Sequence, residues 1–85
     1  MKMGSVVKHP PAALNQSPRV LAAVRAAMRL AKARKFKMAG MCVASLERVS
    51  DAEAAAAMHL FLAALWELPE VQADFDRWSR ERLGA

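Results

Sequence analysis

The sequence contains no isoleucine, threonine or tyrosine, and valine, present seven times, is its only β-branched residue. Strands are usually rich in these residue types, so the composition leaves almost no room for an all-β fold. Alanine, leucine, methionine, arginine and glutamate dominate instead, and these residues lose little freedom or hydration on entering a helix. The composition therefore predicts an all-α fold.

Cysteine occurs once, at Cys42, so the chain cannot form an internal disulfide. This usage is typical of a reducing compartment, and we expect a cytoplasmic protein. Metal sites need clusters of thiolate, imidazole or carboxylate ligands, whereas Cys42, His9 and His59 lie far apart in the sequence. A nucleophilic pair of Cys42 and His59 lacks a third orienting group, so a buried cysteine and a core or interface histidine are the better interpretation. We expect no metal and no cofactor.

Long apolar runs are also missing. The longest stretch without a charged residue runs from Ala54 to Trp66, which is 13 residues and includes His59, whereas a membrane-spanning helix needs about 20 apolar residues. This stretch predicts a buried core helix rather than membrane attachment. Of the 47 hydrophobic residues 19 are alanine, so the 85 residues provide a modest core and little material for a deep pocket. We therefore expect a non-enzymatic protein.

Acidic residues are absent from the first 46 positions, which hold nine lysine or arginine residues. Residues 47–85 hold eight acidic residues and four arginines. The net charge is therefore +9 for residues 1–46 and −4 for residues 47–85. Such an asymmetry predicts either an anionic partner for the first part or pairing between the two parts, within one molecule or between two copies.

Local signals divide the chain into an arm and a helical domain. Residues 1–16 contain glycine and two prolines without apolar periodicity, so we expect an arm that is flexible unless it is docked. Residues 17–85 are predicted to form a single domain, a small bundle of three to four helices. Ser17 and Pro18 mark the first helix start, because a serine hydroxyl accepts a free N–H and proline suits the first helical position. Ser50 and Glu53 form a capping box that starts another helix, and Pro69 ends that helix and opens the last one, about 69–82.

Residues 18–49 are compatible with one helix or with two. In one straight helix Arg34 and Lys35 would fall in the apolar stripe, and Phe36 would point outward among basic residues. This arrangement inverts the preferred burial of both residue types. We therefore predict a break near residues 34–37, although neither glycine nor proline marks it.

Each predicted helix has an apolar face with helical periodicity. The first uses Val20, Val24, Ala27, Met28 and Ala31, and the second uses Met38, Met41, Cys42, Ser45, Leu46 and Val49. The third carries the stripe Ala54, Met58, Phe61, Leu62 and Leu65, but it is apolar on all sides and is predicted to be central. The fourth is predicted at the surface, with the narrow stripe Val71, Phe75 and Trp78, the ion pairs Asp76–Arg80 and Arg77–Glu81, and the terminator Gly84.

Basic residues on one side of the first helix are the strongest functional signal. Arg25, Arg29 and Lys32 repeat at i, i+4 and i+7, and Arg34, Lys35 and Lys37 follow at the predicted break. Such cations neutralise phosphates and release counterions, which is the main source of nucleic-acid affinity, and Phe36 among them is a candidate for stacking on an unpaired base. Solvation of an exposed helix, or docking of an acidic protein, explains the same charges. We expect a regulatory interaction module that docks on an anionic macromolecule, either nucleic acid or an acidic protein surface.

A second hypothesis rests on large apolar side chains. Met38, Met41, Trp66 and Trp78 exceed what so small a core must hide, and methionine is common at adaptable contacts. With the oppositely charged parts, they favour a homodimer or a docked complex over a lone monomer. The alternative function is a protein antagonist of the kind made by phages and mobile elements, which inhibits a bacterial complex by stoichiometric binding without nucleic acid.

Overall fold

The computed structural model describes residues 17–82 and consists, over that range, of helices alone. The elements in chain order are α2 (Pro18–Lys32), α3 (Phe36–Ala44), the short 3-10 helix η1 (Ser45–Arg48), α4 (Asp51–Leu65) and α5 (Pro69–Arg82). The predicted all-α bundle is confirmed. The predicted arm 1–16 and the terminator Gly84 lie outside the described residues.

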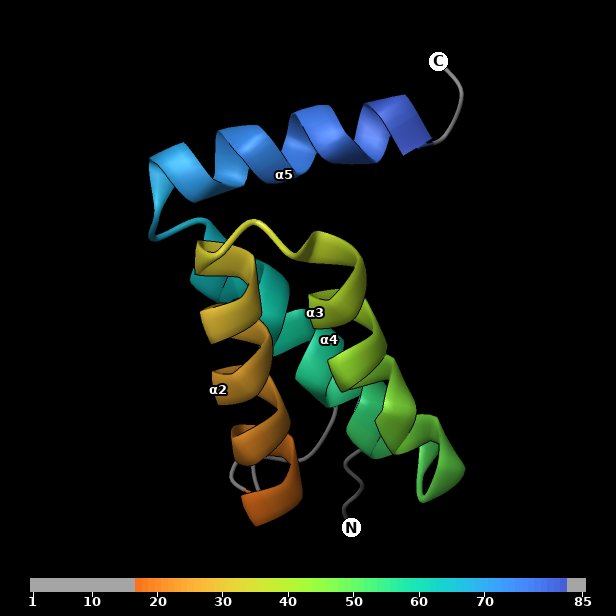
Figure 1. Ribbon diagram of the computed structural model, residues 1–85. Helices are drawn as coiled ribbons and strands as arrows, with labels where there is room; N and C mark the ends of the chain where they lie inside the picture. Colours follow the sequence, from red (N-terminus) through yellow and green to blue (C-terminus); the bar gives the residue numbers. More distant parts are fainter. Residues whose placement is uncertain (1–16, 83–85) are drawn as a thin grey trace, which may run out of the picture.

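Helices α2 and α3 run side by side in opposite directions, and α4 packs behind both of them (Figure 1). Helix α5 turns through 120° relative to α4 and lies across the end of the bundle that carries the α2–α3 loop (Figure 1). Three helices therefore build the main core, and the fourth covers one end of it.

Small side chains line most of the core. Its largest fully buried residues are Phe61, Leu65, Val20 and Val43. The remaining buried hydrophobic residues are Ala27, Ala31, Phe36, Ala39, Leu46, Ala54, Ala56, Ala57 and Val71. Because alanine projects little beyond the backbone, these helices pack closely and bury little apolar area per residue, which agrees with the modest core expected from the composition.

Helix starts follow the sequence signals, although the capping bonds differ. Pro18 occupies the first position of α2, but the side chain of Ser17 makes no capping hydrogen bond, so that part of the prediction is wrong. Ser50 caps α4 as predicted, since its hydroxyl accepts a 3.2 Å hydrogen bond from the N–H of Glu53. The Glu53 carboxylate does not complete the capping box and instead binds Arg19 of α2 through two hydrogen bonds of 3.0 and 2.8 Å.

The predicted break between α2 and α3 falls at residues 33–35. The N–H of Lys35 donates to the carbonyl of Leu30 at 2.8 Å, and the N–H of Arg34 donates to the carbonyl of Ala31 at 2.9 Å. This pattern is a Schellman motif, which requires a left-handed residue after the helix and usually has glycine there. Arg34 takes that conformation with φ 65, so the chain turns without glycine or proline.

The predicted inner face of residues 38–49 is confirmed at Leu46 and, in part, at Cys42, but it is wrong for the other residues. Met38 and Met41 are 53% and 61% exposed, and Val49 is also exposed. The buried residues at this level of the chain are Phe36, Ala39, Val43 and Leu46. The exposed methionines and the buried residues both repeat with helical spacing. The turn at Arg34 orients Phe36, Ala39 and Val43 toward the core.

Helix α4 packs into the core with one side only, which corrects the prediction of a central helix that is buried throughout. It buries Glu53, Ala54, Ala56, Ala57, Phe61 and Leu65. Its opposite side is exposed and carries Ala55, His59, Leu62, Ala63 and Trp66. One apolar face of α4 therefore packs in the core, and the mostly apolar residues of the other face are exposed at the surface.

Helix α5 is held to the bundle by aromatic rings. Phe75 lies 5.5 Å from Phe36, 6.2 Å from Phe61 and 5.9 Å from Trp78 between ring centroids. The predicted stripe of Val71, Phe75 and Trp78 packs on the core as expected. The ion pair of Arg80 with Asp76 is present, whereas Arg77 pairs with Asp74 one turn earlier rather than with Glu81.

Candidate anion-binding surface

The outer side of α2 carries three exposed cations, Arg25, Arg29 and Lys32, which we call the α2 ridge. Successive cations are separated by about 6 Å and about 4.5 Å along the helix axis, because each residue adds about 1.5 Å. The buried residues Val20 and Ala27 lie on the opposite side of the helix. The periodicity that buries one face therefore places all three charges in a line facing solvent, as predicted.

None of the three ridge cations forms an ion pair with another residue in the range 17–82. Two other arginines of the basic part do. Arg19 binds Glu53 through two hydrogen bonds, which hold the pKa of Glu53 below its ordinary value. Arg34 binds Asp74 at 2.7 Å. Basic residues of the first 46 positions thus pair with acidic residues of positions 47–85 within the molecule. The positive charges of the α2 ridge are not neutralised by such pairs within residues 17–82.

Arg34 differs from the ridge in its surroundings. Its Nε donates to Oδ2 of Asp74, and its Nη1 donates to the carbonyl of Lys32 at 2.9 Å. The hydrogen bond from Arg34 is the main reason why the pKa of Asp74 is lowered, and Arg77 adds to the effect. The charge of Arg34 is therefore engaged in holding α5 against the α2–α3 loop.

The prediction that Phe36 stacks on a base is wrong. Phe36 is 5% exposed, and its ring packs against Phe75 and Trp78 at centroid distances of 5.5 and 5.7 Å. The basic residues around it in the sequence suggested an exposed ring, but the turn at Arg34 directs Phe36 inward. The α2 ridge has no aromatic side chain beside it within α2.

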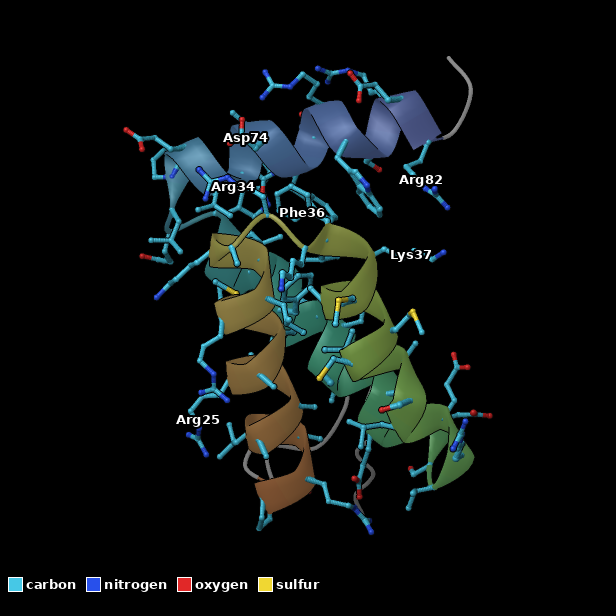
Figure 2. The ribbon with its side chains drawn as sticks, in the orientation of Figure 1. Arg25, Arg34, Phe36, Lys37, Asp74 and Arg82 are labelled. Atoms are coloured by element: carbon cyan, nitrogen blue, oxygen red, sulfur yellow. The ribbon has the colours of Figure 1, made fainter. Side chains whose placement is uncertain are left out.

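Lys35 and Lys37 are exposed as predicted but do not extend the ridge in a straight line. In Figure 2, Arg25 projects from the outer side of α2, whereas Lys37 projects from α3 on the opposite side of the molecule. The six predicted cations therefore divide into the α2 ridge, Lys35 in the loop, the engaged Arg34 and a separate Lys37.

The four residues predicted as a protein interface have different environments. Met38 and Met41 are exposed on α3, and Trp66 is 73% exposed at the end of α4. Trp78 is half-buried in the aromatic cluster, with the guanidinium of Arg82 5.7 Å from its ring centroid. Three of the four side chains are thus accessible, on two different helices.

Cys42 and His59 lie in different environments. The Cys42 thiol donates a hydrogen bond to the carbonyl of Ala23 at 3.6 Å. His59 lies on the exposed side of α4, so it is not a core histidine, and the interface alternative stays a prediction. Over residues 17–82 no group of three histidine, cysteine or acidic side chains is placed to hold a metal ion.

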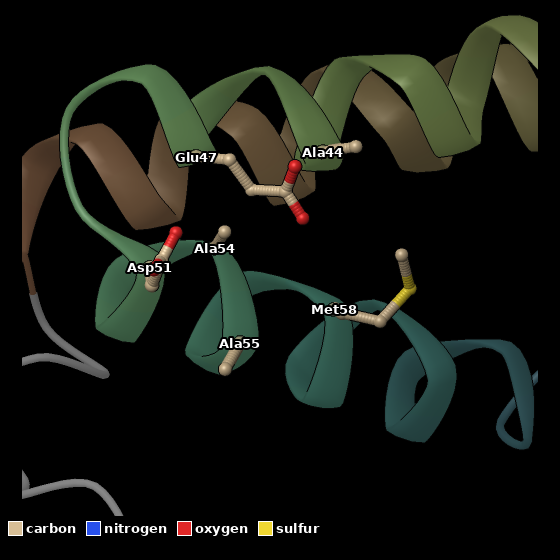
Figure 3. Close-up of a pocket in the computed structure, with 6 residues that line it drawn as sticks. All are labelled: Ala44, Glu47, Asp51, Ala54, Ala55 and Met58. Carbon is tan, nitrogen blue, oxygen red and sulfur yellow. The ribbon is translucent and has the colours of Figure 1, made fainter.

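A groove between η1 and α4 was not predicted from the sequence. It encloses a volume of about 310 Å³ and is lined by Ala44, Glu47, Asp51, Ala54, Ala55 and Met58 (Figure 3). The acidic residues on either side of the Ser50 cap were a signal for it, but their approach to the alanines depends on the turn between η1 and α4.

Comparison of the chain with protein-family models, with curated proteins and with solved structures finds no match. Within the described range no single helix is long and apolar enough to cross a membrane. The pair α4 and α5 meets the criteria of length and composition only when taken together across its bend.

Proposed function

We propose that this protein is a non-enzymatic interaction module whose α2 ridge docks on an anionic macromolecule. One observation carries the proposal: Arg25, Arg29 and Lys32 form an exposed line of charge that no acid of residues 17–82 neutralises. Arginine and lysine side chains at this spacing match repeated phosphates or carboxylates, and such contacts are governed by charge. The single cysteine of the sequence supports a cytoplasmic location for this activity.

Nucleic acid is the form of partner to test first. We expect a fluorescently labelled duplex to bind the full chain at low salt, with affinity that falls as salt rises. Neutralisation of three phosphates predicts a slope of about −3 in a plot of log affinity against log salt. Replacement of Arg25, Arg29 and Lys32 by glutamine should abolish most of this binding.

A matched control removes the same charge elsewhere. Lys37, Arg48 and Arg82 are exposed and lie outside α2, so their replacement by glutamine should leave most of the affinity. Equal losses in the two triple variants would mean that net charge, rather than the α2 ridge, determines binding. If no nucleic acid binds at low salt, a polyglutamate probe tests the acidic-protein form of the proposal, and absence of both interactions rejects it.

A second candidate function is stoichiometric inhibition of a bacterial protein complex, in the manner of phage antagonists. The exposure of Met38 and Met41, one turn apart on α3, supports it, because neighbouring apolar side chains at the surface are a feature of protein interaction sites. This candidate predicts a partner that stays bound in a lysate pull-down after nuclease treatment and at high salt. Replacement of Met38 and Met41 by serine should then release the partner, whereas the triple glutamine variant of the ridge should retain it.

A further inference from the structure

The groove between η1 and α4 combines an apolar floor with a negative rim. Ala54, Ala55 and Met58 come from α4, and Ala44 closes the opposite side. Glu47 reaches over the groove from η1, and Asp51 rises at the end nearest the start of α4 (Figure 3). The volume of about 310 Å³ is at the small end of ligand sites, so it suits a few side chains of a peptide segment.

The two rim carboxylates are not used by the described fold. Glu47 and Asp51 are both exposed, and neither forms an ion pair with another residue in 17–82. The next acid along the chain, Glu53, is bound by Arg19. An occupant that brings positive charge to the rim and small apolar groups to the floor would therefore match the groove in both respects.

Residues 1–16 of the same chain have this chemistry in their sequence. They contain lysine at positions 2 and 8, no acidic residue, and the apolar residues Met1, Met3, Val6, Val7 and Leu14. In an extended segment Val6 and Lys8 point to the same side, about 7 Å apart, so placing Val6 on the floor leaves Lys8 next to the rim. Residues 1–16 therefore match the acidic rim of the groove by their positive charge and its apolar floor by their small apolar side chains.

The start of the described chain lies near the acidic end of the groove. Arg19, in the first turn of α2, binds Glu53, in the first turn of α4, at 2.8 Å. Asp51 belongs to the same turn of α4. Sixteen residues span up to about 50 Å when extended, whereas the 15 residues of α4 extend about 22 Å. The segment is therefore long enough to pass around the start of α4 and enter the groove.

We propose that residues 1–16 dock in cis in this groove, with Val6 on Ala54 and Met58 and a lysine paired with Glu47 or Asp51. Docking would neutralise the acidic rim and cover the apolar floor. It would also leave the α2 ridge, rather than the amino-terminal lysines, as the surface for an external anion. The proposal does not depend on the identity of that anion.

Zero-length carbodiimide coupling of the full chain tests the proposal. At high dilution the reagent should join Lys2 or Lys8 to Glu47 or Asp51, and mass spectrometry of the digested protein identifies the link. An equal mixture of ¹⁴N and ¹⁵N chains should yield links within one isotope only. Links that join two isotopes, links spread over Glu67, Glu70 and Glu81, or no link to the rim would each overturn docking in cis.

Two variants keep the test specific to the groove. Ala55→Trp places a large ring at the exposed edge of the groove and should cause loss of the links, whereas Ala63→Trp, at another exposed position of α4, should retain them. Helix content measured by circular dichroism shows whether both variants fold. As an independent measurement, Val6→Ser with Val7→Ser should shift the methyl resonance of Met58 and leave that of the exposed Met41 unchanged. An unshifted Met58 methyl would also overturn the proposal.

Discussion

Arg34 in the α2–α3 loop donates a 2.7 Å hydrogen bond from Nε to Asp74 of α5, and within residues 17–82 Arg34 is also the one non-glycine residue with a positive φ. The same residue therefore turns the chain between two helices and attaches a third. Its backbone conformation is unfavourable for any residue with a Cβ. Its guanidinium is placed beside the carboxylate of Asp74 in α5.

Two substitutions at Arg34 separate these roles. Both Arg34→Ala and Arg34→Gly remove the ion pair, but only glycine adopts the left-handed conformation without a steric cost. We expect the glycine variant to be more stable than the alanine variant by about 1 kcal/mol in urea unfolding. Ala33→Gly is the control, because Ala33 has φ −85 and glycine there should lower the stability. Equal stability of the two Arg34 variants would contradict the Schellman geometry.

Two ion pairs predict how stability depends on pH. Hydrogen bonds from Arg19 hold the pKa of Glu53 below 4.5, and the hydrogen bond from Arg34 holds that of Asp74 below 3.8, in each case against the opposite effect of burial. The unfolded chain then binds more protons than the folded chain as the pH falls, so both pairs stabilise the fold above pH 4.5 and lose this effect progressively below pH 3.8.

Urea midpoints measured across this pH window check the prediction. The combined variant Glu53→Gln and Asp74→Asn should lower stability at neutral pH and flatten its decline in acid. Glu81→Gln is a suitable control, since Glu81 is exposed and forms no ion pair with the described residues. An acid decline that is equally steep in the combined variant would show that other groups cause it.

Gly40 offers a stabilising substitution. It lies inside α3, and a Cβ built on it meets no atom within 4 Å. Glycine in a helix interior costs about 0.5–1 kcal/mol relative to alanine, so Gly40→Ala should raise the free energy of unfolding by about that amount. A lower midpoint in urea would mean that α3 needs the freedom of glycine at this position.

Two aromatic residues should respond differently to truncation. Phe36→Ala empties the centre of the aromatic cluster and should cost about 3 kcal/mol, together with a change in the fluorescence of Trp78, which packs on it. Trp66→Ala removes an exposed ring and should change stability by less than about 0.5 kcal/mol. Similar losses in both variants would contradict the burial that the structure assigns to them.

The boundaries of the helices were predictable because their signals are local. Proline is tolerated in the first turn of a helix but disrupts its interior, so Pro18 and Pro69 mark helix starts. The hydroxyl of Ser50 caps the N–H of Glu53, only three positions away. The break before Phe36 was predictable for a different reason, since an uninterrupted helix would have buried basic residues. All of these inferences compare neighbours in the sequence.

The direction of α3 was not predictable in the same way. Met38 and Met41 repeat with helical spacing, and so do Ala39 and Val43 on another side. Which stripe faces inward depends on the left-handed turn at Arg34, and arginine gives no sequence signal for that turn. The same turn buries Phe36 and directs Lys37 away from the α2 ridge, which is why part of the predicted site had to be revised.

Beyond Val71 near its start, α5 meets the bundle through the aromatic cluster with Phe36 and Phe61 and through the pair of Arg34 with Asp74. Of these partners, Arg34 and Phe36 lie in or directly after the α2–α3 loop (Figure 2). Weakening of this loop would therefore release residues 69–82 as one cooperative unit before the remaining three helices unfold. The partially opened molecule would expose the rings of Phe36 and Phe61, which are buried in the intact fold. Association between copies would therefore begin from the opened state rather than from the native surface.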